Sequence, residues 1–444
     1  CRRSFQYSAS FVPMSLRSRV NGSWDVRASA LARNTHNLIR DIVENLQVEP
    51  NPEKQLIALS VALARNTHNL IRDIVENLQV EPNPEKQLIA LSVGKCCAIQ
   101  EPPSHAVRDS LEWTSSRSYG PAKGHQEARE AVAEYSAHQG EVKPDDVVLC
   151  SGCSHAIELV ISVIADSGQN ILVPRPGFMI YKTVAEGLGI IIKYYNLLPD
   201  QQWKVDLEDL ENQIDDDTAA IVVINPSNPC GSVYNKEHLH EIVDVASRNR
   251  VPIIADEIYE HFVFSGHESI AISSISKDVP VLTCSGLTKR FLVPGWRMGW
   301  VIIHDRHNIL GKDIRKAIAN LSNRILGPNT LIQRALPSIL RDTPQSFFDE
   351  VVLFIEVSLR PIMPQGAMYM MIEIKMSMFP KFKSELQFVE RLVSEQSILR
   401  EACRRVTAFC TDHIVYKENL KEIICNDISI PNEPQVIDDL EQVA

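Results

Sequence analysis

The chain has 444 residues, enough for roughly two to three domains and a large core without disulfides. Hydrophobic residues make up 44% and charged residues 23%, which excludes a natively disordered chain, and no apolar run is long enough to predict a transmembrane helix. The formal net charge of −11 argues against a protein that binds nucleic-acid phosphates. Ten scattered cysteines indicate an intracellular enzyme with reduced thiols.

Residues 1–29 predict a leader that is disordered. No acidic residue precedes Asp25, and arginines stand among serines, which is typical of a mitochondrial transit peptide. The alternative is an untranslated or disordered leader with Met14 as the start. We expect a cytoplasmic protein, with a mitochondrial location as the alternative.

Residues 30–61 recur without a single change as residues 62–93. Solenoid repeats need at least three copies and diverge, so this pair indicates a duplication instead. Each copy predicts an amphipathic helix, a Pro-Asn-Pro break and a short strand. Only the second copy continues into Gly94, so we expect it to dock and the first copy to be surplus. Residues 62–117 then form an N-terminal arm and part of a small domain.

Strands and helices alternate over residues 118–310. Apolar runs predict strands at 147–150, 170–173, 190–195, 220–225, 251–256, 279–284 and 300–304, and the best helical pattern is 236–248. This order predicts an α/β fold whose large domain has a mostly parallel seven-stranded sheet covered by helices. A smaller α+β domain, truncated here, would use the N-terminal part and residues 311–426. Residues 427–444 carry five acids and no base, and predict a solvated tail.

The turn after the first strand of that series allows three interpretations. Cys150 and Cys153 have the spacing of a redox pair. Gly152 and Ser154 come close to the nucleophile elbow of hydrolases. Alternatively, small residues at the start of a helix form a cradle for an anion, because free amides and the helix dipole attract it.

Two further turns follow strands. Residues 225–231 combine prolines, a glycine and Asn228 in a rigid turn. Asp256 ends an apolar strand, with Tyr259 three residues later. The spacing of Glu257 and His261, like that of Asp256 and Glu260, also makes a metal site conceivable.

Residues 285–299 carry a lysine and an arginine among small residues. Lys289 is a candidate for covalent attachment of a carbonyl group, because a desolvated amine is nucleophilic. Arg297, after Pro-Gly, suits bidentate recognition of a phosphate. The alternative for both is a structural role at the surface.

Taken together, these motifs resemble the class I aminotransferase family of fold-type-I pyridoxal-phosphate enzymes. Residues 286–299 match the lysine-attachment signature of that family, and SGCSHAIEL, NILVPRPGF, NPSNPCGSVY, DEIY and RILGP are also similar. The chain most resembles members that transfer the amino group of aromatic amino acids such as L-tyrosine to 2-oxoglutarate, in tyrosine and phenylalanine catabolism. We expect no metal at the site.

The resemblance implies roles around the cofactor ring. Lys289 would attach pyridoxal 5′-phosphate and move the proton, and Asp256 would pair with the pyridine nitrogen. Tyr259 and Asn228 would hydrogen-bond the phenolate oxygen, and Phe178 would stack on the ring.

The resemblance also implies a phosphate site and a dimer. Gly152, Cys153, Ser154 and Arg297 would bind the phosphate. Tyr119 falls in the Tyr-x-Pro-x-x-Gly motif of the family, whose tyrosine reaches the phosphate of a neighbouring subunit, so a homodimer is implied. Gly94 and Asn228 are expected at the substrate.

The chain also departs from the family. Gly94 is followed by Lys-Cys instead of Asp-Pro, and about a dozen residues are missing between 348 and 364. At Leu399-Arg400 the strand with the arginine that binds the substrate carboxylate is absent, and Arg400, Arg404 and Arg405 belong to the following helix. One alternative is therefore a cofactor-binding but catalytically impaired paralogue or a defective gene model. Another is a different enzyme on this scaffold, such as an aminocyclopropane-carboxylate synthase or a carbon–sulfur lyase.

Overall fold

The computed structural model describes residues 24, 26–34, 103–113, 117–264, 266–349 and 365–366. All of them belong to one compact unit of the chain, and a second unit lies outside the described residues. The predicted domain boundaries are therefore not tested beyond this unit.

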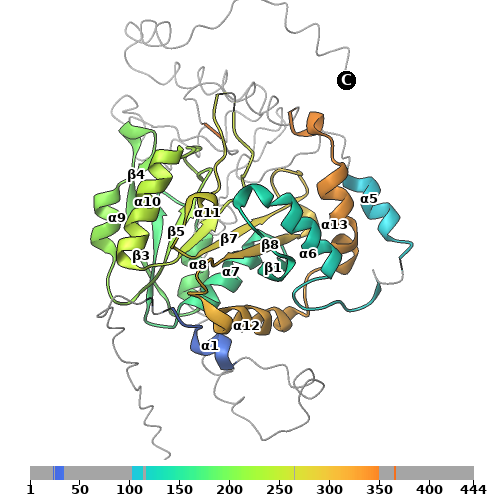
Figure 1. Ribbon diagram of the computed structural model, residues 1–444, viewed down its shortest axis with the longest axis horizontal. Coiled ribbons are helices and arrows are strands. Elements are labelled where there is room, and N and C mark those ends of the chain that lie inside the picture. Colours follow the sequence, from blue (N-terminus) through green and yellow to red (C-terminus); the bar gives the residue numbers. More distant parts are fainter. Residues whose placement is uncertain are drawn as a thin grey trace, which may run out of the picture. The chain divides into compact units, whose positions relative to one another are not determined.

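An eight-stranded sheet forms the centre of the unit, in the order β1-β8-β7-β6-β5-β2-β3-β4 (Figure 1). Its strands are β1 (Val147–Cys150), β2 (Asn170–Arg175), β3 (Ile191–Leu198), β4 (Lys204–Val205), β5 (Thr218–Ile224), β6 (Ile253–Asp256), β7 (Val281–Gly286) and β8 (Gly299–His304). All seven strands expected from the sequence are present, with ends shifted by up to three residues.

The sheet is mostly parallel, as predicted, and differs from the prediction in two details. β8 is antiparallel to both β1 and β7. The twelve residues between β7 and β8 hold no crossover helix, and a parallel pair needs a crossover connection, usually helical. The eighth strand, β4, has two residues and is antiparallel to β3. Such a short edge strand gives no periodic signal in the sequence.

Helices surround this sheet. They are α1 (Ala30–Asn34), α5 (Pro103–Ser110), α6 (Gln126–Tyr135), α7 (Cys153–Ile164), α8 (Ile180–Gly187), α9 (Leu207–Gln213), α10 (Lys236–Asn249), α11 (Ile272–Ile275), α12 (Gly311–Ser322) and α13 (Thr330–Asp342). Short 3₁₀ turns are η2 (Ala137–Gln139), η3 (Pro144–Asp146), η4 (Pro199–Gln201), η5 (Pro294–Trp296) and η6 (Asn323–Ile325). In Figure 1, α9 and α10 lie at the end of the sheet with β3 and β4, and α5, α6 and α13 lie at the other end.

The core follows from the composition of the strands. Every residue of β5, β6 and β7 is buried, as expected for central strands covered on both faces. β1, β8, α6 and α13 share a second apolar cluster that includes Trp300, Phe291 and Leu336. The loop with Lys289 is anchored to this cluster through Leu287 and Phe291, which holds the loop against the end of the sheet.

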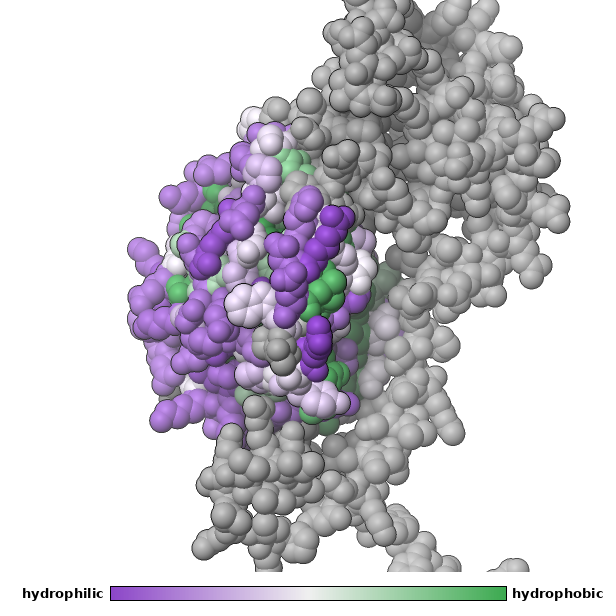
Figure 2. Space-filling model, turned by 90° about the vertical axis from the view of Figure 1, so that its right-hand side faces the viewer, coloured by the Kyte–Doolittle hydropathy of each residue, from purple (hydrophilic) through white to green (hydrophobic). Residues whose placement is uncertain are grey.

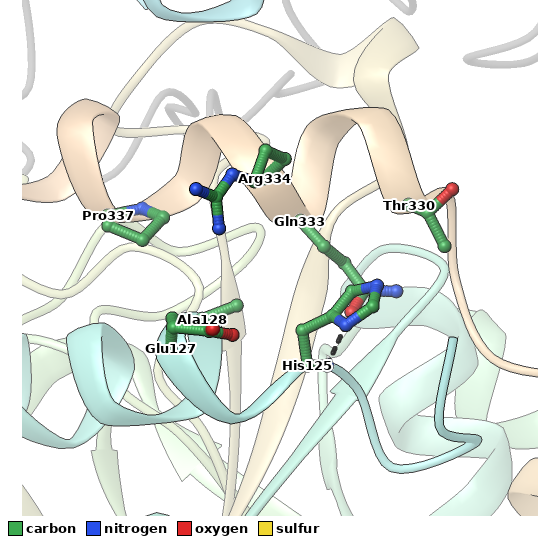
Figure 3. Close-up of a pocket in the computed structure, with 7 residues that line it drawn as sticks. All are labelled: His125, Glu127, Ala128, Thr330, Gln333, Arg334 and Pro337. Carbon is green, nitrogen blue, oxygen red and sulfur yellow. Dashed lines mark hydrogen bonds between the residues drawn. The ribbon is translucent and has the colours of Figure 1, made fainter. Parts of the chain in front are cut away.

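Polar contacts join α6 to α13 at a small cavity of about 70 Å³ (Figure 3). The backbone amide of His125 donates to Oε1 of Gln333 at 2.8 Å, which satisfies an amide just before α6. The cavity is too small for a cofactor, and we assign it to helix packing.

The start of the first repeat copy is packed in the structure. α1 contacts α7 and α12, and Ala28, Ser29 and Ala32 are buried. The Ser29 amide donates to the carbonyl of Val163 at 2.6 Å, and its hydroxyl donates to the carbonyl of Ser162. The first five residues of the first copy are thus packed, and the expectation that this copy is surplus stays a prediction. The rest of both copies lies outside the described residues.

Deleting residues 30–61 is expected to leave the melting temperature and cofactor occupancy nearly unchanged. The deletion joins Ser29 to Ala62, and residues 62–66 repeat the ALARN of α1, so the packed helix is regenerated. Deleting 62–93 yields the identical chain. Differential scanning calorimetry of the deleted and full chains measures the effect; a fall of several degrees in melting temperature would show that the longer connection itself stabilises the protein.

The described helices include none that is long and apolar enough to cross a membrane. The side of the molecule with α5 and α13 presents mainly hydrophilic residues, interrupted by smaller hydrophobic areas (Figure 2).

Candidate active site

Six strands direct their carboxyl ends to one edge of the sheet, and five of them, all except β3, lead into segments with predicted site residues. β2, β3, β5, β6 and β7 pair in parallel, and β1 shares their direction because both β1 and β7 are antiparallel to β8. At this edge Gly299, the first residue of β8, lies opposite Cys150 and Gly286. The segments that follow the five strands, and the one that precedes β8, carry the predicted site residues from Gly152 to Arg297.

The N-terminus of α7 forms a cradle at this edge. Its N-cap, Gly152, has φ +82°, which residues with side chains rarely adopt. A Cβ at Gly152 would lie 2.5 Å from Nη2 of Arg297, and a Cβ at Gly299 would lie 2.6 Å from the amide nitrogen of Cys153. The amides of Cys153 and Ser154 have no acceptor inside the helix and are available to an anion.

Arg297 is held beside this cradle by backbone carbonyls. Its Nη2 donates to the carbonyl of Ser151 at 3.2 Å, and its Nη1 donates to that of Pro294 at 3.1 Å. The side chain is exposed, and its own φ of +49° directs the chain from η5 into β8. A guanidinium fixed next to free helix amides is suited to a phosphate group.

Asp256 is a buried carboxylate at the end of β6. Its Oδ2 accepts from the hydroxyl of Tyr181 at 2.5 Å, and its Oδ1 accepts from the amide of Ile258 at 3.3 Å. The thiol of Cys153 lies 3.9 Å from the same Oδ1. Burial raises the pKa of Asp256 above its ordinary value, although these donors and the charge of Lys289 lower it. A cationic ligand next to this carboxylate would keep it ionised.

Lys289 and Tyr259 lie together. The Nζ of Lys289 is 5.3 Å from the centroid of the Tyr259 ring, within range of a cation–π contact. Tyr259 is 1% exposed and packs edge-on against Phe262. Lys289 is half-buried, so its amine is in reach of a ligand at this edge. The structure thus brings Lys289, Tyr259 and Asp256 to one region.

Three predicted residues stand at the rim. Asn228 is half-buried in the turn after β5, and Phe178 is 39% exposed after β2. Tyr119 is 87% exposed, beside a groove formed by residues 117–120 and 325–330. No contact in the described residues joins these three side chains to Lys289 or Asp256. Gly94, Arg400, Arg404 and Arg405 lie outside the described residues.

The competing interpretations of the turn after β1 find no support. Cys150 and Cys153 are free and buried, and burial raises the pKa of both thiols, so neither is a ready thiolate. Ser154 is exposed, and the Nδ1 of the nearby His155 accepts from the amide of Ser151.

Comparison with known proteins decides the family. The family model for aminotransferases of class I and II matches residues 86–415. Tyrosine aminotransferase of Mus musculus is 43% identical over 437 residues, with 90% of each chain covered. The human protein of the same name is 41% identical over 451 residues, with 93% of each chain covered.

The chain belongs to the aminotransferase class I and II family. Among solved structures, tyrosine aminotransferase from Leishmania infantum superimposes with a TM-score of 0.72 at 27% identity, covering 83% of this chain and all of that chain. Enzymes of this family use pyridoxal 5′-phosphate.

The described residues fit this cofactor. A cradle that a Cβ at Gly152 would fill, flanked by Arg297, suits the phosphate. The buried carboxylate of Asp256 suits a protonated pyridine nitrogen, and the amine of Lys289 suits the aldehyde. When bound, the cofactor supplies an electron sink for the bonds around the substrate Cα.

Tyr181 is a residue of this site that the sequence analysis missed. It lies in α8, three residues after Phe178, and is 1% exposed. The signal was an aromatic residue within the first turn of a helix that follows a strand end. Its hydroxyl makes the shortest polar contact of Asp256 among the described residues, so it is a positioning residue for this carboxylate.

Replacing Tyr181 by phenylalanine is expected to weaken cofactor binding by roughly tenfold or more, since a hydrogen bond to a charged group contributes about 1.5–3 kcal/mol. Loss of the hydroxyl also raises the pKa of Asp256 further, so the weakening grows as pH falls. The dissociation constant of pyridoxal phosphate between pH 6 and 9 measures both effects. Tyr195→Phe is the matched control, because the buried hydroxyl of Tyr195 donates instead to the carbonyl of Val222 at 2.7 Å. Equal constants for the two variants would contradict the role of Tyr181.

Proposed function

We propose that the chain is a tyrosine aminotransferase, which converts L-tyrosine and 2-oxoglutarate to 4-hydroxyphenylpyruvate and L-glutamate. The observation that carries the proposal is the meeting of Lys289, Asp256 and the α7 cradle at one sheet edge. Relatives named tyrosine aminotransferase, from mammals to Dictyostelium discoideum, support the substrate class.

Each residue around the cofactor ring would have a separate role, which follows from the chemistry of its side chain. Lys289 would hold the cofactor and would move the proton of the substrate Cα. Asp256 would keep the pyridine nitrogen protonated, which would maintain the electron sink. Tyr259 and Asn228 would hydrogen-bond the ring oxygen, and Phe178 would stack on the ring.

The phosphate would anchor the cofactor at the helix. Gly152, Cys153 and Ser154 contribute amides at the N-terminus of α7, and Arg297 contributes charge. A phosphate fixed at one end and a carboxylate at the other hold the reacting carbon in one orientation, and such positioning supplies much of an enzyme's rate.

The test uses the full chain loaded with pyridoxal phosphate. We expect 4-hydroxyphenylpyruvate to form from L-tyrosine only when 2-oxoglutarate is present, and faster than oxaloacetate forms from L-aspartate. A chain that holds the cofactor but prefers aspartate would contradict the aromatic substrate class.

A catalytically impaired member of the family is the second candidate. The feature that favours it is the junction at Leu399-Arg400 in the sequence, where the resemblance to the family implies a segment with a carboxylate-binding arginine that this chain lacks. Losing one partner of such a charge pair costs about 2–5 kcal/mol. This candidate predicts a turnover for tyrosine at least about a hundredfold below that of an intact relative. A turnover within about tenfold of that relative would exclude it.

A lyase is the third candidate. S-alkyl-thiohydroximate lyase of Arabidopsis thaliana is 31% identical over 351 residues. The lyase candidate predicts that the chain cleaves a carbon–sulfur bond without consuming a 2-oxo acid. The same assay, run with a sulfur-containing substrate, would detect this cleavage.

A homodimer in the cytoplasm completes the proposal. Tyr119, Ile325 and Leu326 are exposed hydrophobic side chains in the groove formed by residues 117–120 and 325–330, and a second copy of the chain would cover them. The four described cysteines are free, in keeping with a reducing compartment. Sedimentation equilibrium would test the dimer, and a monomeric holoenzyme would contradict it.

A further inference from the structure

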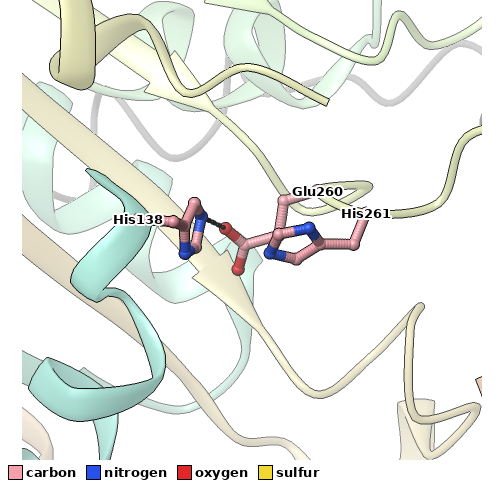
Figure 4. A group of neighbouring side chains, drawn as sticks. All are labelled: His138, Glu260 and His261. Atoms are coloured by element: carbon pink, nitrogen blue, oxygen red, sulfur yellow. Dashed lines mark ion pairs between the residues drawn. The ribbon is translucent and has the colours of Figure 1, made fainter. Parts of the chain in front are cut away.

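Two histidines and a glutamate meet at the turn that follows β6. His138 comes from η2, and Glu260 and His261 come from the turn that follows β6 (Figure 4). Nε2 of His138 lies 3.4 Å from Oε2 of Glu260, and one ligand atom of each residue lies within 4.8 Å of the others. Glu260 and His261 are adjacent in the sequence, but His138 precedes Glu260 by 122 positions. The cluster therefore exists only in the folded chain.

Glu260 carries a buried negative charge. It is 4% exposed, and in the part of the chain that the structure describes its ion pair is with His138 alone. A buried carboxylate of this kind needs a compensating cation.

Neighbouring side chains fix the orientation of that carboxylate. The side-chain amide of Gln139 donates to Oε2 at 3.0 Å, and the hydroxyl of Ser285 donates to Oε1 at 2.9 Å. Hydrogen bonds of this type orient the ligands of metal ions in proteins.

His261 is directed at Glu260 by an unusual backbone. Its φ is +59°, which is uncommon for a residue with a side chain. The rings of His138 and His261 have centroids 4.5 Å apart.

We propose that His138, Glu260 and His261 form a binding site for a divalent transition-metal ion, of which Zn²⁺ fits best. Zinc accepts imidazole and carboxylate ligands at about 2.0–2.2 Å in tetrahedral geometry, with ligand atoms about 3.3 Å apart. The pair of His138 and Glu260 already has this spacing, and rotation of the His261 side chain closes the third contact. Water completes the fourth position.

The ion ties η2 to the turn that carries Asp256 and Tyr259. It takes no part in the transamination chemistry proposed above, and its contribution is to the stability of that turn. The Glu257–His261 spacing in the sequence shares His261 with the proposed site but not its carboxylate. Oε1 of Glu257 accepts instead from the amide of Ile272 at 3.0 Å.

The test is equilibrium dialysis of the full chain, loaded with pyridoxal phosphate, against Zn²⁺, followed by metal analysis. We expect the wild-type chain to retain one Zn²⁺ more than His138→Gln and His261→Gln. His307→Gln is the matched control, since His307 pairs with a single carboxylate, Asp278, at 3.1 Å, and it should retain as much as the wild type. Equal retention in all four chains would overturn the proposal.

A second measurement needs no variant. In the wild-type chain, Zn²⁺ should protect His138 and His261, but not His307, from carbethoxylation by diethyl pyrocarbonate, as read by mass spectrometry of the peptides. Co²⁺ bound in place of Zn²⁺ should give visible ligand-field bands without the thiolate charge-transfer band. Labelling of His138 that is indifferent to Zn²⁺, or a thiolate band, would place the metal elsewhere and overturn the site.

Discussion

Replacing Lys289 by alanine is expected to lower tyrosine turnover by about 10²–10⁴-fold, the usual contribution of a positioned proton-transfer group. The variant also loses covalent attachment of the cofactor, because Lys289 is the amine beside Tyr259. Borohydride reduction followed by peptide mass spectrometry measures attachment directly, as a mass increase on the peptide that contains residue 289.

Two control variants separate charge from chemistry. Lys289→Arg keeps a cation near Tyr259 but is not nucleophilic, so it should be as inactive as the alanine variant. Lys312→Ala, on the exposed side of α12, should behave as the wild type. A borohydride-fixed cofactor in Lys289→Ala would assign the attachment to another lysine.

Replacing Asp256 by asparagine is expected to lower turnover by roughly two to three and a half orders of magnitude. Breaking a buried charge pair costs about 3–5 kcal/mol, and each 1.36 kcal/mol corresponds to about a tenfold change in rate. Asparagine keeps the shape and the bond with Tyr181, so the loss measures the negative charge. The variant should still attach the cofactor through Lys289, and single-turnover kinetics should show slow chemistry with attachment intact.

Asp215→Asn is the matched control for that change. Asp215 pairs with Lys193 at 2.6 Å, and although burial opposes it, hydrogen bonds from Lys193, Asn170 and Thr218 lower its pKa to about 2. Because Asp215 precedes β5, away from the carboxyl ends of the strands, its replacement should lower stability and leave turnover unchanged. Stability at pH 7 gained from this lowered pKa is lost as pH falls from 4 through 2. Equal turnover of Asp256→Asn and Asp215→Asn would contradict the role of Asp256.

The strands could be predicted from the sequence because apolar runs are local signals, and the candidate site residues were proposed from their positions directly after those strands. Apolar runs located all seven expected strands, and chemistry-bearing residues directly after them fell at one sheet edge. Lys289, Asp256 and Gly152 were found because strand ends converge in α/β sheets.

The remaining features depend on long-range packing. The reversal of β8 follows from the absence of a crossover helix, and the role of Tyr181 depends on α8 meeting the end of β6. The pairing of His138 with Glu260 joins residues more than a hundred positions apart, and no periodicity in the sequence reports it.

Ser29 favours the binding of the first repeat copy over the second at the surface formed by α7 and α12. The ALARN pentapeptide occurs at residues 30–34 and 62–66, so α7 and α12 face two identical ligands tethered to the same chain. The seated copy is preceded by Ala28 and Ser29, whereas Ser60 and Val61 precede the other. Valine cannot supply the hydroxyl that Ser29 donates to Ser162. The choice between the two copies therefore rests on the residue that precedes each pentapeptide. In a chain with Ser60→Ala and Val61→Ser, either copy would occupy the surface equally well.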